Sequence, residues 1–434
     1  MTGCTSAASS AGHGDSSGVG SQVNAELRRE LAAWYPGAVD EDHGDGTGGF
    51  HSQFDADWNR LPGQGRFVVF QSRLTWTAAE VARQRPDWAN VYLPYAEHGF
   101  QFLASQQWDT KHGGFFWEIA EPGAANPPQY QEKHAYGISF GIYAAAAVYQ
   151  ANHDPRALKL AVEAFRWLDA HAHDVRNGGY FEALAPDGTP VLHAPGNAGA
   201  DTTKDRIGTP YGQKSMNAHI HLLESFTALY RIWPDRILRQ RLEELFILVR
   251  DRFPAPPGYL SLHYTVDWKP IAGNASYGHD VETAFLLLES AEALGIKDDP
   301  ATWDLAKRLW DNALKYGYDD THGGFFNEGP SGQRATDRKK VWWVQAEALN
   351  SLLVMHEHFG QRDPRYLDAF MKTWDFTKTH QIDTERGGWN DEVSEDGTKV
   401  LTPAKSNDWK DPYHTVRALL NMSEILEKQP QRSK

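Results

Sequence analysis

A glycine followed by an aromatic residue recurs six times along the 434 residues of this chain, at nearly even intervals. The pairs are Gly49-Phe50, Gly114-Phe115, Gly179-Tyr180, Gly258-Tyr259, Gly324-Phe325 and Gly388-Trp389. Successive aromatic residues are 65, 65, 79, 66 and 64 positions apart. In four copies an aspartate precedes the first glycine by four residues, as Asp109, Asp174, Asp319 and Asp383. A period of this length indicates a repeated supersecondary unit that buries its apolar face by stacking on its neighbours.

Two helical patterns fit into each period, so the sequence predicts twelve helices. We place them near 25–37, 74–85, 94–107, 134–151, 155–173, 215–233, 235–253, 278–295, 299–317, 341–360, 364–381 and 409–428. Alternate helices are apolar around much of their circumference, which suits an inner ring buried on several sides. Six helical hairpins predict an all-α fold, an (α/α)6 toroid in which the last helix packs beside the first. The Gly-aromatic turns should form short β-hairpins at one end, after each outer helix.

We expect one catalytic domain over residues 25–430. The preceding segment, 1–24, should be disordered, because Met1 to Gly20 is rich in Ser, Gly and Ala and has no apolar run. The longest step of the repeat leaves an insertion near 183–212, rich in Gly, Pro, Thr and Asp. We expect this insertion to lie as a loop over the mouth of the ring.

The charge and composition exclude several classes of partner. A formal net charge of −14 argues against nucleic acid and anionic membranes, and the chain has no apolar run long enough to span a bilayer. The single cysteine, Cys4, cannot form an intrachain disulfide or a thiolate metal site. A neutral small molecule fits better, bound by a cytoplasmic monomer or homodimer. Alternatively, Thr2-Gly3-Cys4 resembles the end of a lipoprotein cleavage box, which would make the chain an exported lipoprotein.

The predicted inner helices all begin with polar or aromatic side chains that are costly to bury without partners. These residues are Arg73; Tyr136; Asn217 and His221; His279 and Glu282; Trp342, Trp343 and Glu347; and Trp409, His414 and Arg417. Six helix N-termini would converge on one funnel, where their macrodipoles and unpaired N–H groups favour a transient anion such as an enediolate.

Two histidines with pKa values near neutrality suit proton transfer beside a carbonyl group. His279 and His414 could do this, one taking a proton and the other returning it on the opposite face. Glu282 follows His279 by three residues and could orient or charge its imidazole. Arg73 and His221 could hold the developing oxyanion. Trp342, Trp343 and Trp409 could stack on a sugar, although core packing is the alternative for about half of these rings.

Metal binding has little support in the sequence. His219 and His221 are two residues apart on a predicted helix, as are His171 and His173, so neither pair can share one ion. The glycine-rich turns also lack the spacing of nucleotide-binding loops.

Six segments at the helix starts carry a resemblance to a known family: Phe70-Gln-Ser-Arg73, Lys133-His-Ala-Tyr136, Lys214-Ser-Met-Asn-Ala-His-Ile-His221-Leu-Leu-Glu224, Tyr277-Gly-His279-Asp-Val-Glu282, Lys340-Val-Trp-Trp-Val-Gln-Ala-Glu347 and Trp409-Lys-Asp-Pro-Tyr-His414. They resemble the N-acylglucosamine 2-epimerase family, and within it the cellobiose 2-epimerases most closely. The resemblance covers nearly everything after about residue 25. It implies an (α/α)6 barrel, no cofactor, no metal, and deprotonation and reprotonation at C2 of a sugar through a cis-enediolate.

The resemblance also implies roles for individual residues. His279 and His414 align with the acid/base pair, His221 and Arg73 with groups that assist ring opening and steady the intermediate, and Glu282 with a partner of His279. Tyr136, Asn217, Trp343 and Trp409 match sugar-contacting positions, and we expect Trp342, Glu347 and Arg417 to bind substrate with them.

Several alternatives stay open. Asp411, Thr415 and Ala218 stand where a cellobiose epimerase is expected to have Gly, Asn and Thr, so the substrate is either a disaccharide or a monosaccharide. Mannose 2-epimerase, N-acylglucosamine 2-epimerase and aldose–ketose isomerase activities use the same histidines. A glycoside hydrolase with Glu282 and Glu347 as its two carboxylates is a different class. A non-catalytic sugar-binding protein is another.

Overall fold

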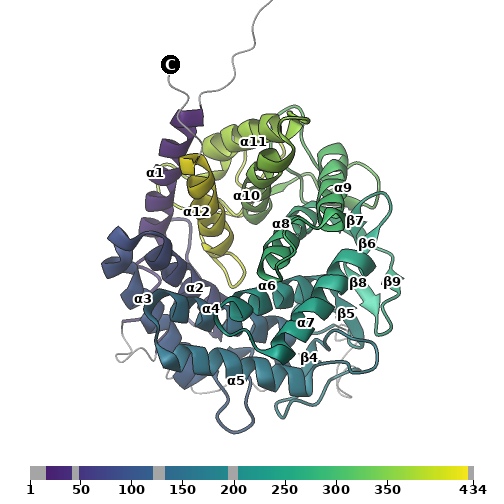
Figure 1. The fold of residues 1–434 in the computed structure, drawn as a ribbon. Coiled ribbons are helices and arrows are strands. Elements are labelled where there is room, and N and C mark those ends of the chain that lie inside the picture. The colour runs from purple at the N-terminus through teal and green to yellow at the C-terminus, as the bar shows by residue number, and fades with distance from the viewer. Residues whose placement is uncertain (1–15, 42–47, 121–131, 194–203, 429–434) are drawn as a thin grey trace, which may run out of the picture.

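A computed structural model describes residues 16–41, 48–120, 132–193 and 204–428, which form twelve α-helices in two concentric rings (Figure 1). The inner ring consists of α2 (Val68–Gln84), α4 (Ala135–Asn152), α6 (Met216–Ile232), α8 (Tyr277–Ala293), α10 (Trp342–Phe359) and α12 (Tyr413–Lys428). The outer ring consists of α1 (Ser16–Trp34), α3 (Ala89–Phe102), α5 (Pro155–His171), α7 (Arg236–Ile247), α9 (Pro300–Tyr316) and α11 (Arg365–Phe376). Each inner helix contacts the next, and α12 contacts both α2 and α1. The predicted (α/α)6 toroid is confirmed.

Burial explains the assignment of helices to rings. In α4 every residue from Ala135 to Val148 is buried, whereas α5 and α9 bury one face only. The outer helices α5, α7 and α9 are each preceded by an N-cap aspartate, Asp154, Asp235 and Asp299, whose carboxylate accepts backbone N–H groups of the first turn. The sequence therefore marks outer helices by capped, amphipathic starts and inner helices by nearly continuous apolar stretches.

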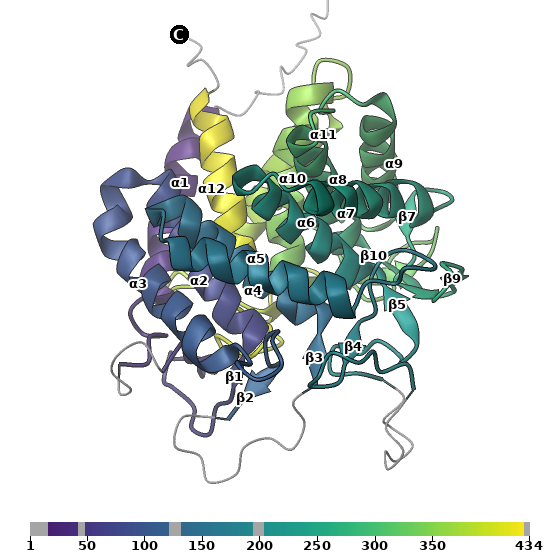
Figure 2. The ribbon, with the colours of Figure 1, turned by 60° about the horizontal axis from the view of Figure 1, so that its bottom comes forward.

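Short antiparallel strands gather at the end of the ring where the inner helices begin (Figure 2). The pairs are β1 (Arg66–Phe67) with β2 (Glu118–Ile119), β3 (Lys133–His134) with β4 (Ala183–Leu184), β10 (Asn274–Ser276) with β11 (Glu328–Pro330), β12 (Lys340–Val341) with β13 (Glu392–Val393), and β6 (Pro254–Ala255) with β7 (Tyr259–Leu260). A further sheet has the order β5 (Gln213–Ser215), β8 (His263–Thr265), β9 (Pro270–Ile271). Strands β1, β3, β5, β10 and β12 each lead directly into an inner helix, so the sheets fix the helix starts around the mouth.

The Gly-aromatic turns are the predicted hairpins, and each follows an outer helix. Single β-bridges close five of them, for example Trp108 with Phe115 and His173 with Tyr180. Three of the preceding outer helices end in a π-helical turn, Leu103–Gln107, Leu248–Arg252 and Thr377–Gln381, and a 3₁₀ turn, Pro86–Trp88, precedes α3. In four copies both glycines have positive φ, for example 76° and 69° at Gly178 and Gly179, a conformation that favours glycine.

The repeated aspartate fastens each hairpin to the mouth. Asp174 accepts the backbone N–H groups of Arg176 and Asn177, and its other oxygen lies 2.8 Å from the Nζ of Lys214, a fully buried lysine just before α6. Lys214 also donates to the carbonyl of Gly178. Burial would raise the pKa of Asp174, but Lys214 and the N–H groups lower it to about 2.

The same ion pair recurs around the ring. Lys133, Lys340 and Lys405 bind Asp109, Asp319 and Asp383, and Arg66 binds Asp40 in the first copy. In five of the six copies an aspartate therefore connects the hairpin to the segment leading into an inner helix, and the Gly258-Tyr259 copy has no aspartate at this position.

Four predicted helix starts are wrong by four residues or more, and one of them is that of α3, which begins at Ala89 rather than 94. Helix α1 begins at Ser16, so the expected disordered segment 1–24 is helical over its last nine residues; Val19, Val23, Leu27 and Leu31 bury one face of this helix. Helix α2 begins at Val68 rather than 74, which places Arg73 in its second turn. Helix α12 begins at Tyr413, so Trp409 lies in the loop before it. Tertiary contacts, which single-residue preferences do not report, set these ends.

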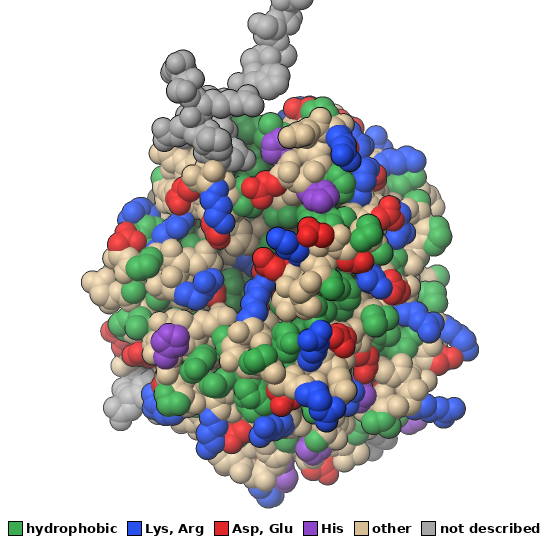
Figure 3. Space-filling model, viewed as in Figure 1, with side chains coloured by type: hydrophobic (Ala, Val, Ile, Leu, Met, Phe, Trp, Pro, Cys, Tyr) green, Lys and Arg blue, Asp and Glu red, His purple; other side chains and the backbone are tan. Residues whose placement is uncertain are grey.

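Some predictions fall partly outside the described residues. These are the Thr2-Gly3-Cys4 motif, the disorder of residues 1–15 and the middle of the insertion at 183–212, of which 194–203 is not described. Among the helices that the structure describes, none is both long and apolar enough to cross a bilayer. On the face seen in Figure 3, basic and acidic side chains are interspersed around a central hollow, a pattern unlike the basic surface that nucleic acid requires.

Candidate active site

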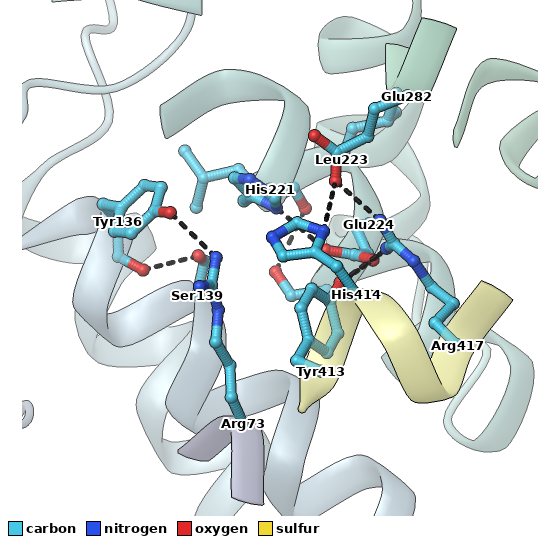
Figure 4. Close-up of polar contacts among 12 residues, drawn as sticks. Arg73, Tyr136, Ser139, His221, Leu223, Glu224, Glu282, Tyr413, His414 and Arg417 are labelled. Atoms are coloured by element: carbon cyan, nitrogen blue, oxygen red, sulfur yellow. Dashed lines mark hydrogen bonds and ion pairs between the residues drawn. The ribbon is translucent and has the colours of Figure 1, made fainter. Parts of the chain in front are cut away.

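Arg73, Tyr136, His221 and His414 come from four different inner helices and meet at the axis of the ring (Figure 4). All four are at least 95% buried. The ring of Tyr136 lies 5.2 Å from that of His221, and its hydroxyl accepts a hydrogen bond of 3.1 Å from Arg73. The predicted convergence of the inner-helix starts is therefore present in the structure.

His414 is held by a carboxylate. Its Nδ1 lies 2.6 Å from Oε1 of Glu347, on the neighbouring helix α10. Because an ionised carboxylate only accepts hydrogen bonds, Nδ1 carries the proton and Nε2 is left as a lone pair. Burial lowers the pKa of His414 well below its usual value, and Arg73 adds to this effect. A neutral imidazole with a free Nε2 can act as a general base.

His221 is held in the same way by Glu224, one turn further along α6. The distance from Nδ1 of His221 to Oε2 of Glu224 is 2.9 Å. Burial lowers the pKa of His221 to about 3. This histidine is therefore neutral as well, again with its proton on Nδ1.

His279 differs from the other two because no carboxylate in the described part of the chain is hydrogen-bonded to it. Its Nδ1 lies 2.7 Å from Oγ of Ser276, the residue before α8. The indole of Trp343 stands between the two proposed proton-transfer groups, with its ring centroid 4.7 Å from that of His279 and 5.7 Å from that of His414. Burial lowers the pKa of His279, although Glu282 opposes this.

Arg417 occupies the layer beneath the histidines. Its Nη2 lies 2.6 Å from Oε1 of both Glu282 and Glu347, and its Nη1 contacts Glu224 and the hydroxyl of Tyr413. Arg417, Glu282 and Glu347 are all at most 3% exposed. These three side chains bind one another beside the histidines, and contact of Glu347 and Arg417 with substrate stays a prediction.

Glu282 is not the hydrogen-bond partner of His279 that its spacing suggested. The carboxylate turns toward the next helix, where Oε1 binds Arg417 and lies 3.8 Å from Nδ1 of His414. Trp342 lies in the hydrophobic core, the alternative given above, and its contact with substrate stays a prediction. It is 6% exposed and packs beside the Nζ of Lys410 at 5.3 Å, as a core residue.

Arg73 presents a positive charge at the base of the site. Its Nη1 lies 3.2 Å from Oδ2 of Asp411, and its guanidinium stacks over the ring of Phe140 at 4.5 Å. Burial disfavours its charge, but neighbours such as Tyr136 and Asp411 outweigh that cost and raise its pKa above the usual value. Asp411, which the sequence showed only as an unexpected residue, therefore orients this arginine.

Two further predicted residues lie where a ligand could reach them. Trp409 is 40% exposed, and its ring lies 5.0 Å from that of Phe67 and 6.2 Å from that of Tyr136. Asn217, in the first turn of α6, has a buried Oδ1 without a hydrogen-bond partner in the described part of the chain. An unsatisfied acceptor of this kind suits a sugar hydroxyl group.

Glu282, Glu347 and His414 have the spacing of a metal-ligand set. However, Nη2 of Arg417 already binds both carboxylates at 2.6 Å, so a cation of the chain itself compensates their charge. Where Asp319, His322 and Glu395 come together, Asp319 is likewise bound by Lys340. His219, considered above as a ligand, accepts the backbone N–H of Tyr180 through Nε2.

No role was predicted for Glu224, Ser276 or Tyr413, although Glu224 and Tyr413 stand in two of the segments that resemble the family. Glu224 could have been found, because it follows His221 by three residues, the spacing that had drawn attention to Glu282 and Arg417. Ser276 precedes its helix by one residue, as N-cap residues do, but its hydroxyl is used for His279. Tyr413 carries no pattern that separates it from a core aromatic residue.

Comparisons with known proteins agree with this geometry. A model of the N-acylglucosamine 2-epimerase (GlcNAc 2-epimerase) family matches residues 48–418. A cellobiose 2-epimerase from Bacteroides fragilis is 28% identical over 403 residues, which cover 92% of this chain and 97% of that protein. A D-mannose isomerase from Thermobifida fusca is 26% identical, with 91% and 92% covered. The structure of cellobiose 2-epimerase from Spirochaeta thermophila superposes with a TM-score of 0.81 at 32% identity, covering 95% of this chain and 97% of that one.

Proposed function

Because the chain belongs to the N-acylglucosamine 2-epimerase family and is a carbohydrate epimerase or isomerase, we propose that it inverts C2 of the reducing-end sugar of a cellobiose-type disaccharide. The observation that carries this proposal is the placement of two neutral imidazoles, His279 and His414, beside one indole ring. Such a pair can remove a proton from one face of a carbon atom and deliver another to the opposite face.

The reaction begins from the open-chain aldehyde. One histidine removes the C2 proton, and the electron pair moves into the C1–C2 bond while the carbonyl oxygen takes up negative charge. The guanidinium of Arg73 and the surrounding inner-helix N-termini stabilise this cis-enediolate. The other histidine, which is in its imidazolium form at this step, then protonates C2 from the opposite face, so the two histidines exchange protonation states. Protonation at C1 instead would give the ketose, which is the aldose–ketose isomerase alternative.

Trp409 favours a disaccharide over a monosaccharide. It is the one residue of the predicted site whose ring is substantially exposed, at 40%, and it stands at the mouth beside Phe67. An exposed indole can stack on a second sugar ring while the first ring occupies the histidine layer. A monosaccharide would leave this ring uncovered. Mannose 2-epimerase, N-acylglucosamine 2-epimerase and mannose isomerase activities are therefore the second candidates.

A two-carboxylate hydrolase is less compatible with the structure. Glu282 and Glu347 bind the same nitrogen of Arg417, and both are at most 1% exposed. A glycosidase needs two carboxyl groups on either side of an accessible glycosidic bond.

The proposal is tested by incubating the protein with cellobiose, mannose or N-acetylglucosamine in deuterated water, with NMR detection. We expect the C2 epimer of cellobiose to accumulate with deuterium at C2, faster than the monosaccharides react. Faster conversion of mannose would select the monosaccharide alternative, and fructose as its product would select the isomerase. Release of glucose from cellobiose would contradict the proposal.

The acid limb of the pH profile should lie below the usual histidine range. A general base works only when unprotonated, and burial lowers the pKa values of both His279 and His414 below 6.5. We therefore expect the rate of C2 hydrogen exchange with solvent, the step that needs only an unprotonated histidine, to stay level as the pH falls from 8 through 6.5, and to decline only at lower pH. Initial rates across this range, with near-UV circular dichroism at each pH to monitor folding, measure this. A decline with an apparent pKa at or above 6.5 would contradict the assignment.

A further inference from the structure

Two of the three site histidines are oriented by carboxylates that share one guanidinium. Glu224 binds Nδ1 of His221 through Oε2 at 2.9 Å, and its Oε1 faces Nη1 of Arg417. On the other side, Oε1 of Glu347 lies 2.6 Å from both Nδ1 of His414 and Nη2 of Arg417. All five side chains are at least 95% buried.

Glu224 has no freedom to turn away from His221. Its Oε1 accepts hydrogen bonds from Arg417 and from the hydroxyl of Tyr413, which leaves Oε2 directed at the imidazole. Because this carboxylate can only accept, it selects the His221 tautomer with the proton on Nδ1. A glutamine at this position could donate through its amide nitrogen and select the opposite tautomer.

We propose that Glu224 is the positioning residue of His221. In this proposal Arg417 also holds the carboxylates of Glu224 and Glu347 at a fixed distance from each other, so that the orientations of His221 and His414 depend on the same guanidinium. The chemical role that Glu224 supports in His221 is opening of the sugar ring, and this role rests on the proposed function. With its proton on Nδ1, His221 can take the proton of the anomeric hydroxyl O1 at Nε2. The C1–O5 bond then breaks, its electron pair goes to O5, C1 and O1 form the carbonyl, and the same proton is returned to O5. Ring opening of the sugar is thereby balanced without another reactant.

The experiment compares the wild type with Glu224→Gln. In protein carrying ¹⁵N-labelled histidine, the His221 signals are assigned by their loss in His221→Asn. We expect wild-type His221 to be protonated on Nδ1 and unprotonated on Nε2, and this pattern to reverse or average in Glu224→Gln. A wild-type His221 protonated on Nε2 would overturn the proposal, and so would an unchanged tautomer in the variant.

Kinetics supply a second readout that a purely structural role would not change. We expect Glu224→Gln to lower kcat at least about tenfold with little change in KM, because Glu224 acts through the histidine. Ring opening should then limit the rate, so the isotope effect of C2-deuterated sugar should fall toward unity. In Glu347→Gln, which acts on C2 deprotonation through His414, the isotope effect should persist.

The control variant is Glu289→Gln, a partly exposed glutamate on α8 that pairs with Arg231 on the rim of the ring. It should keep wild-type rates and the wild-type His221 tautomer. A loss of rate in Glu224→Gln no larger than in this control would also overturn the proposal. If the wild type epimerises no sugar, the proposed function fails, whereas the tautomer measurement still decides the role of Glu224.

Discussion

Replacing His414 with asparagine should stop interconversion of the C2 epimers while leaving exchange of the C2 hydrogen in one epimer. Each histidine serves one face of C2, so the remaining His279 can still remove a proton and return deuterium to the same face. The rate of epimerisation should fall by roughly 10²–10⁴, the usual contribution of a general acid or base. His279→Asn should show the complementary pattern, with exchange confined to the other epimer.

Both variants are measured by NMR in deuterated water, starting separately from each epimer. His358→Asn is the matched control, because this histidine lies on the inner helix α10 but is exposed and stacks on Trp303. It should retain wild-type rates. If His279→Asn and His414→Asn exchanged the same epimer, the two histidines would lie on one face. If either kept nearly full epimerisation, it would have no role in proton transfer.

The fold could be predicted from the sequence because its repeat is local. Each Gly-aromatic turn has a glycine with positive φ, and an apolar inner helix follows each turn, so the number of units and their order follow from the repeat. The ends of α1 and α12 could not be predicted in this way. Ser16 to Asn24 is helical through packing of Val19 and Val23, and Trp409 lies outside α12 although its aromatic character suited a helix start.

The sequence grouped most of the residues that meet at the axis of the ring, but it did not show how far along its helix each one lies. His221, His279 and His414 were grouped with every polar residue in the first turns of the inner helices. Arg417 follows His414 by three residues, which at about 1.5 Å rise per residue places it roughly 4–5 Å deeper along the helix. At that depth its guanidinium binds the carboxylates of Glu282 and Glu347. Spacing within one helix shows which residues share a face, and it does not show which residues of a neighbouring helix lie opposite.

The pairing across helices decides the chemistry. Sequence spacing pairs Glu282 with His279, yet Oε1 of Glu282 binds Arg417. The carboxylate that is hydrogen-bonded to His414 is that of Glu347 on α10. A short contact between α10 and α12 depends on the closure of the ring, which fixes helix neighbours but not side-chain rotamers. The proposed pair of proton-transfer histidines is therefore asymmetric, since Nδ1 of His414 is bound to a carboxylate and Nδ1 of His279 to a hydroxyl group.

Replacing Arg417 with methionine should cause the largest loss of stability of any single change in the site. The side chain is similar in length, but three buried carboxylates, Glu224, Glu282 and Glu347, would lose their shared cation. Removing one partner of a buried ion pair typically costs about 3–5 kcal/mol, and we expect at least that decrease in the free energy of unfolding at pH 8. Arg231→Met removes an ion pair with Glu289 in which the arginine side chain is 37% exposed. This change should lower the free energy of unfolding by less than about 1 kcal/mol.

The loss in Arg417→Met should depend on pH in a defined direction. Burial already raises the pKa values of Glu224 and Glu347, and removal of the guanidinium that opposes this effect raises them further. A carboxyl group whose pKa is higher in the folded state than in the unfolded state binds its proton more readily when folded, so the destabilisation is greatest at high pH. It shrinks as the pH falls through the raised pKa toward the unfolded value near 4.5. Urea unfolding of the wild type and both variants at pH 8 and pH 5 measures the difference. A deficit in Arg417→Met that is equal at the two pH values, or no larger than that of Arg231→Met, would show that the three carboxylates do not depend on this guanidinium.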